Sequence, residues 1–146
     1  MNPTDFHTLA QTLLKKQGAA ECRTAISRAY YAAHHVAVRL LTKRIGASIG
    51  QGTNAHGNAM NCLSNSGDTE VMRLGNQLGD LYSKRIRADY YLDRTDVENL
   101  GTAAGYVEQA RRMIEALELC SRDGERLDRM RETIRAAPAT KHLLRG

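Results

Sequence analysis

The residues best suited to carry chemistry centre on segment 84–91, where an arginine interrupts an apolar pattern. Arg85 falls on a helical stripe whose other members are apolar: Leu74, Leu78, Leu81, Ala88 and Leu92. A guanidinium on such a stripe is costly unless it is paired or reaches an opening. Asp89, one turn later, can pair with it, so a structural bridge and a functional cleft are both open. Lys84 and Arg87 flank the pair and make the neighbourhood electropositive.

Two polar columns run along stretch 20–45, which also has helical spacing. One column contains Arg23, Ser27, Tyr30 and His34; the other, facing further outward, contains Thr24, Arg28, Tyr31, His35 and Arg39. Steps of three and four residues place side chains on one face of a helix. Such columns are candidates for contact with a nucleic acid. They are also what a boundary face requires, where tyrosines bury their rings and keep their hydroxyls in water.

The spacing of histidines and cysteines does not indicate a metal site. No pair among them has ligand spacing on one helix face or loop, so neither a metal nor a cofactor is expected. Cys22, Cys62 and Cys120 are odd in number and far apart, which predicts free buried thiols instead of a disulfide framework. The glycine-rich stretch 46–57 lacks the lysine that a P-loop needs.

Charge and hydropathy narrow the class of protein. The 146 residues carry a formal net charge of +5, which favours encounters with polyanions such as RNA without requiring them. No apolar run is long enough to span a bilayer, and the start of the chain does not resemble a secretion signal. A cytoplasmic protein without membrane contact is therefore expected.

The hydropathy pattern predicts helices throughout. Apolar residues recur at steps of three and four before Gly18, then along 20–45, around 56–63, along a stretch that ends near Leu92, and along 100–117. Strand alternation is absent, and the only prolines lie near the two ends. We expect an all-α protein: an up-and-down bundle of four to five helices in residues 1–122, followed by a C-terminal amphipathic helix and tail in 123–146.

Several local signals refine this expectation. Gly46 is expected to end the second helix, and Gly67-Asp68 to provide a break and an N-cap. Thr95 and Glu98 have the spacing of a capping box that would open the next helix. The C-terminal helix, stopped by Pro138, could lie on the bundle or on a second subunit, or it could fray.

Glycines four residues apart occur within two of the expected helices. They are Gly75 and Gly79 in one helix and Gly101 and Gly105 in another. A glycine costs about 1 kcal/mol in a helix interior. Close approach of another backbone is one possible compensation.

Three segments together resemble the HEPN superfamily. Residues 27–33 read Ser-Arg-Ala-Tyr-Tyr-Ala-Ala, His56 follows in the middle of the chain, and residues 85–90 read Arg-Ile-Arg-Ala-Asp-Tyr. They are similar to the branch with an SRxYYAxFHAA second helix, a histidine in the middle loop and a late RxxADY helix. The similarity extends from about Thr8 to Leu117.

The resemblance implies a homodimer whose late helices face one another across a cleft. Many HEPN proteins are metal-independent endoribonucleases of toxin–antitoxin, CRISPR-linked or phage-defence systems, often encoded beside a nucleotidyltransferase. Their usual motif is an arginine, then four to six intervening residues, then a histidine. Arginine can stabilise the charged phosphorane, and a base can deprotonate the 2′-hydroxyl.

The chain departs from that motif, because Tyr90 stands where the histidine is expected. A phenol with a pKa near 10 is a poor general base at neutral pH, so His56 or His34 would have to enter the cleft. The expected catalytic set is therefore Arg85, Asp89, Tyr90 and His56. The expected nucleic-acid contacts are Arg23, Lys84, Arg87, Tyr30, Tyr31 and His34.

Two functions from different classes follow, together with a structural alternative. The chain could be an RNA-directed HEPN-like protein that cleaves RNA. It could also be a non-catalytic HEPN module that binds a nucleotide, RNA or a nucleotidyltransferase partner. In the third case, the pair formed by Arg85 and Asp89 only fixes the register of a dimer.

Overall fold

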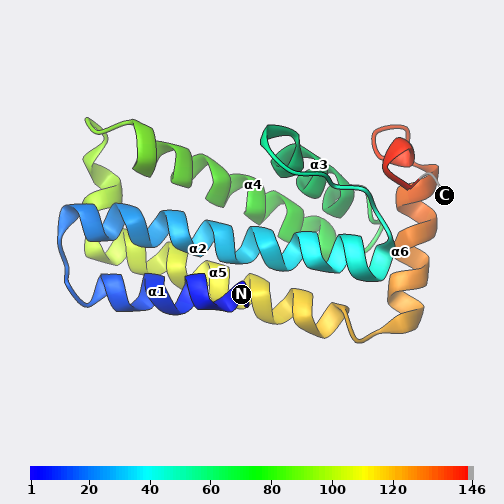
Figure 1. The fold of residues 1–146 in the computed structure, drawn as a ribbon, viewed down its shortest axis with the longest axis horizontal. Helices are drawn as coiled ribbons and strands as arrows, with labels where there is room; N and C mark the ends of the chain where they lie inside the picture. Colours follow the sequence, from blue (N-terminus) through cyan, green and yellow to red (C-terminus); the bar gives the residue numbers. More distant parts are fainter. Residues whose placement is uncertain (145–146) are drawn as a thin grey trace.

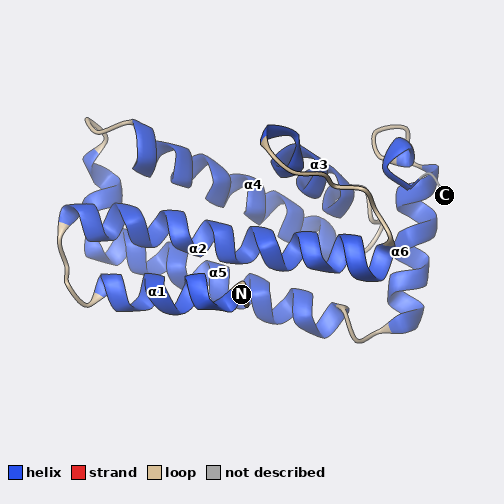
Figure 2. Ribbon diagram, in the orientation of Figure 1, coloured by secondary structure: helices blue, strands red, loops and turns tan. Residues whose placement is uncertain are grey.

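The computed structural model describes residues 1–144 and confirms the all-helical prediction (Figures 1 and 2). No strand occurs among these residues. The six α-helices are α1 (Thr4–Leu14), α2 (Ala19–Leu40), α3 (Thr53–Ser64), α4 (Thr69–Tyr90), α5 (Leu100–Cys120) and α6 (Gly124–Ala136). Three shorter turns complete them: a π-turn at Leu41–Ile45 and 3₁₀ turns at Thr95–Glu98 and Lys141–Leu144.

Helix α2 is the centre of the bundle and packs against α1, α4 and α5. Its inward face is rich in alanine, including Ala25, Ala29 and Ala33, each with no exposed surface. Small side chains let neighbouring helices approach closely, so a single helix can contact three others. Helix α3 packs on α4, and α6 lies across one end of the bundle (Figure 1). No helix of the described residues is long and apolar enough to cross a membrane.

The predicted helix ends are confirmed in two places and wrong in a third. Gly46 ends the α2 region with φ 87°, and Asp68 caps α4 by accepting a hydrogen bond from the Val71 amide at 3.0 Å. The capping box at Thr95 does not form. Asn99 caps α5 instead, while the carboxylate of Glu98 pairs with the guanidinium of Arg23. A long-range ion pair has displaced the local cap.

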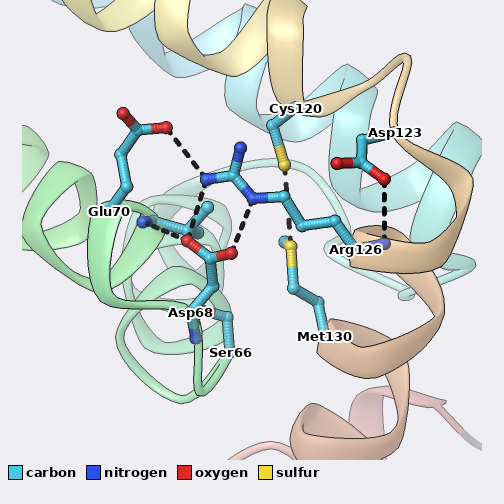
Figure 3. Close-up of polar contacts among 8 residues, drawn as sticks. Ser66, Asp68, Glu70, Cys120, Asp123, Arg126 and Met130 are labelled. Carbon is cyan, nitrogen blue, oxygen red and sulfur yellow. Dashed lines mark hydrogen bonds and ion pairs between the residues drawn. The ribbon is translucent and has the colours of Figure 1, made fainter.

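The C-terminal helix lies on the bundle, which selects one of the three arrangements left open by the sequence. Leu127, Met130 and Ile134 are buried in the same apolar cluster as the other helices. Arg126 donates hydrogen bonds to Asp68 at 2.6 and 2.8 Å and to Glu70 at 2.8 Å, which ties α6 to the start of α4 (Figure 3). The boundary at residue 122 therefore separates helices but does not divide the core.

All three cysteines are free and buried, as predicted. Burial raises the pKa of the Cys62 thiol to about 11, so this group stays protonated at neutral pH. The cysteines therefore serve as small apolar side chains of the core.

Gly75→Ala should destabilise the protein, because α3 leaves no room for a methyl group there. A Cβ at position 75 would lie 2.9 Å from the Ser64 Oγ, 3.0 Å from the Leu63 Cβ and 3.1 Å from the Ser64 amide nitrogen. Overpacking of this kind costs about 1–3 kcal/mol, measurable by urea unfolding. Gly105→Ala is the matched control, since no atom lies within 4 Å of its Cβ. That variant should gain up to about 1 kcal/mol, and equal losses at both sites would contradict the packing argument.

Arg126→Leu should remove about 2 kcal/mol of stability near pH 7, because it strips two carboxylates of a partly buried partner. The hydrogen bonds from Arg126 hold the pKa of Asp68 below its ordinary value. Their stabilisation is therefore complete above the unfolded-state pKa and is lost as the pH falls through the folded-state pKa. The stability gap between wild type and variant, measured by urea unfolding from pH 7 to pH 3, should narrow.

The control is Arg135→Leu, whose ion pair with Glu132 is exposed on both sides. It should change stability by about 0.5 kcal/mol or less at every pH. A gap for Arg126→Leu that stays constant with pH would contradict the assigned role of Asp68.

Candidate functional site

Arg23 closes the C-terminal end of α4, although its sequence position suggested contact with nucleic acid. Its guanidinium donates to five backbone carbonyls, those of Arg87, Ala88, Tyr91, Leu92 and Arg94, and it pairs with Glu98 at 2.6 Å. A helix end leaves its last carbonyls without intrahelical donors, and these bonds supply them. All three guanidinium nitrogens take part. These contacts give Arg23 a structural role, and its position does not support the predicted contact with nucleic acid.

Arg85 lies buried between α2 and α4, with 7% of its surface exposed. Three tyrosine rings surround its guanidinium carbon at 5.7 Å for Tyr30, 5.3 Å for Tyr31 and 5.2 Å for Tyr82. The faces of aromatic rings attract a cation, most strongly where water is excluded. We call Arg85 and these three tyrosines the arginine cage.

The polar partner of the cage is Asp89, as the spacing on α4 predicted. One carboxylate oxygen lies 3.4 Å from an Nη of Arg85 and accepts a hydrogen bond from the Ser27 hydroxyl at 3.1 Å. The Nε of Arg85 is the only buried side-chain polar atom of the described residues that lacks a hydrogen-bond partner. The buried charge is thus held by one long ion pair and by rings, and its hydrogen-bonding capacity is not exhausted.

Two histidines from different helices meet above the cage. The imidazoles of His34 on α2 and His56 on α3 stack with centroids 4.5 Å apart. The Tyr30 hydroxyl lies between them, 2.6 Å from the Nδ1 of His56 and 3.5 Å from the Nδ1 of His34. Tyr30 therefore belongs both to the cage and to a group that we call the histidine–tyrosine trio: His34, Tyr30 and His56.

The trio is held in its uncharged form. Burial, followed by the nearby positive charges, lowers the pKa of His34 to about 4. The same causes lower the pKa of His56. Burial raises the pKa of the Tyr30 hydroxyl despite the opposing charge of Arg85. At neutral pH, two neutral imidazoles and one protonated phenol consequently share a short chain of hydrogen bonds.

The two histidines of the trio line an open pocket of about 490 Å³, which we call the histidine pocket and which Tyr31, His35 and the turn that precedes α3 also line. Tyr30 has no exposed surface and does not line this pocket. Gly50 and Gly52 of that turn have φ of 80° and 81°, which favours glycine. These two glycines therefore allow the tight turn that forms one wall of the pocket. The volume is within the range of small-ligand sites.

The structure brings together part of the set predicted from the sequence. Six of the predicted residues lie in or beside the two groups just defined: Arg85, Asp89, Tyr30, Tyr31, His34 and His56. Tyr90 does not join them: it is 68% exposed at the last residue of α4. Five residues along a helix turn a side chain well away from the face of Arg85, so the proposed catalytic role of Tyr90 is not supported by its position.

Lys84 and Arg87 also face other neighbours. The ammonium of Lys84 lies 5.9 Å from the ring centroid of Tyr106 on α5, and Arg87 pairs with Asp96 at 2.8 Å. Both side chains remain partly exposed. They provide positive charge near the end of α4 but do not line the histidine pocket.

Sequence reasoning missed Tyr82, which completes the cage. It stands three residues before Arg85 and so shares its face of α4, a spacing that was available from the sequence. His35 was recognised only as a member of the outer column. Its ring stacks on both Tyr31 and Phe6 beside the pocket.

Searches against protein-family models, curated proteins and solved structures found no match for the chain.

Proposed function

We propose that the histidine–tyrosine trio is an acid–base centre for metal-independent cleavage of RNA, in which the 2′-hydroxyl attacks the adjacent phosphate. The observation that carries this proposal is the contact of the buried Tyr30 hydroxyl with two imidazoles that line an open pocket. The resemblance of segments 27–33 and 85–90 to HEPN proteins supports the same class of reaction. Here the histidines come from α2 and α3 instead of following Arg85 on α4.

The Tyr30 hydroxyl gives the two imidazoles complementary roles. It can donate one proton and accept another, so when it donates to one Nδ1 it can accept from the other. One ring then has a lone pair on its Nε2, and the other has a proton there. A base and a proton donor are thereby paired without either ring being charged, which fits the lowered pKa values of both histidines.

The proton balance of the reaction closes within the trio. The Nε2 with the lone pair takes the proton of the attacking 2′-hydroxyl, and its own Nδ1 proton moves to Tyr30. The Tyr30 proton moves to the second Nδ1, and the second Nε2 releases its proton to the departing 5′-oxygen. The oxygen–phosphorus bond to the 2′-oxygen forms while that to the 5′-oxygen breaks, and the trio ends uncharged with its tautomers exchanged.

Arg85 supplies the positive field beneath this centre. Its charge lies behind the rings of Tyr30 and Tyr31, so it acts on the reacting phosphate through space. It also disfavours protonation of both histidines. Asp89 pairs with the guanidinium and is itself held by the Ser27 hydroxyl, which fixes the position of Arg85.

The second candidate is a non-catalytic module in which the same pocket binds RNA, a nucleotide or a nucleotidyltransferase partner. The feature that favours it is the strong burial of His34, which is only 5% exposed. In this function the trio recognises a ligand by hydrogen bonds and transfers no proton. Under both proposals the protein forms a homodimer and is located in the cytoplasm.

Tyr30→Phe should abolish most of the cleavage of total RNA in EDTA, because the ring stays in the cage while the proton relay is lost. A positioned acid–base group contributes about 10²–10⁴-fold, and a loss of that size is expected for Tyr30→Phe and for His56→Ala. The readout is the initial rate of product formation on denaturing gels.

The control is His142→Ala, an exposed histidine in the last turn of the described chain, which should cleave at the wild-type rate. Intact RNA with the wild-type protein, together with retained RNA binding, would favour the non-catalytic module. Equal rates for wild type and Tyr30→Phe would reject the relay.

The pH profile of cleavage should be flat from about pH 7 to 9, because the reactive form of the trio is neutral. Activity should fall on acidification as the histidines, whose pKa values lie below the ordinary 6.5, become protonated. Arg85→Met removes a charge that lowers both pKa values, so its acid limb should move to higher pH. A mechanism that needs an imidazolium would instead lose activity above pH 7, and initial rates across pH 4–9 separate the two.

A further inference from the structure

The outer polar column of α2 forms a surface of which the proposed chemistry uses only Tyr31. Tyr31, His35 and Arg39 follow one another at steps of four residues, and Lys43 continues the series in the next turn. Four residues of α-helix advance by about 6 Å. The side chains therefore form a ladder that runs from the histidine pocket toward the end of α2, with a spacing comparable to that of neighbouring phosphates in an extended strand.

Three adjoining hollows follow this ladder. The histidine pocket shares His35, Val38 and Thr42 with a second hollow of about 350 Å³. The second hollow shares Arg39 and Lys43 with a third, of about 320 Å³, which lies between α2 and the end of α5. Each hollow shares wall residues with the next, so the three follow one another along α2; we call the three together the α2 groove.

The α2 groove is positively charged. Arg39, Lys43 and Arg44 line it, and Glu118 is the only acidic residue among its lining residues. Within residues 1–144, none of the three cations forms an ion pair, whereas most arginines of α5 and α6 do. Unneutralised cations in a groove attract a polyanion and release its counterions.

Flat rings accompany the charges. His35 stacks on both Phe6 and Tyr31, with centroid distances of 6.0 and 6.1 Å and interplanar angles of 28° and 27°, and it remains exposed. The Arg28 guanidinium lies 5.1 Å from the Phe6 ring and 5.0 Å from the Tyr31 ring. Burial, followed by the charge of Arg28, lowers the pKa of His35, which keeps this ring neutral. A platform of this kind suits nucleobases, which a plain polyanion lacks.

We infer that the α2 groove binds a single-stranded nucleic acid, with Arg39 and Lys43 contacting the backbone and His35 stacking on a base. The inference rests on the proposed function in one respect only, the direction of the strand, which would pass into the histidine pocket. In a duplex the faces of the bases are stacked on their neighbours, so no base face is free to stack on His35, whereas a single strand can offer one. We therefore expect the groove to bind a single strand in preference to a duplex.

The test measures binding of a fluorescent 12-nucleotide oligodeoxyuridylate by anisotropy, using the full chain at several salt concentrations. Such a strand lacks the 2′-hydroxyl and cannot react, so the result is independent of cleavage. The double variant Arg39→Ala/Lys43→Ala should bind at least tenfold more weakly at low salt. The slope of the logarithm of the binding constant against the logarithm of the salt concentration should become less steep by about 1.4, the value for two phosphate contacts on a single strand. His35→Ala should cost roughly tenfold through loss of stacking.

The matched control removes two positive charges elsewhere. Lys15→Ala/Lys16→Ala alters exposed residues between α1 and α2 and should change affinity less than twofold. If both double variants lost the same affinity, net charge alone would explain the loss and the proposed binding in the α2 groove would be wrong. Inorganic polyphosphate that competes with the oligonucleotide and is equally sensitive to His35→Ala would overturn the stacking role. If the oligonucleotide binds in a manner that depends on Arg39 but the protein cleaves no RNA, the α2 groove is supported as a binding site and the proposed reaction is rejected.

Discussion

The placement of one positive charge between α2 and α4 constrains the whole site. Burying a guanidinium is costly, and Arg85 has only one carboxylate partner, at 3.4 Å. The compensation comes from three tyrosine rings and from Asp89, whose second contact is Ser27. Since two of the three rings belong to α2, the cage fixes the rotation of α2 relative to α4. That rotation determines which side chains of α2 face the pocket.

The charge also adds to the effect of burial, which is the main reason why the histidines stay neutral. Burial opposes protonation most, followed by the charges of His56, His35 and Arg85, so the pKa of His34 is lowered to about 4. An acid–base centre that relied on an imidazolium would work poorly beside Arg85. A pair of neutral rings joined by a phenol is compatible with the charge, because the net charge of the trio does not change during proton transfer. The same feature that looks unfavourable for folding thus selects the kind of chemistry that the site can support.

Much of the fold, but only part of the site, could be predicted from the sequence. Periodicity located the helices because burial of an apolar face is a local pattern, and Arg85 stood out as the exception on that pattern. The pairing of Arg85 with Asp89 was also local. The meeting of His34 with His56 was not, because it depends on how α3 folds back over α2 after the loop 46–52. No spacing within one helix encodes that contact.

Two local motifs have outcomes that depend on long-range partners. The capping box was predicted wrongly, and the glycine spacing left its outcome open. Glu98 had the spacing of a capping-box residue, yet it pairs with Arg23, and Arg23 in turn serves the carbonyls at the end of α4. Likewise, Gly75 marks a close approach of α3, whereas Gly105, with identical spacing to its neighbour, faces open space. A local motif states which interactions are available to a residue. Which one forms depends on whether another helix brings a stronger partner, and a buried guanidinium, whose N–H groups all require acceptors, is such a partner.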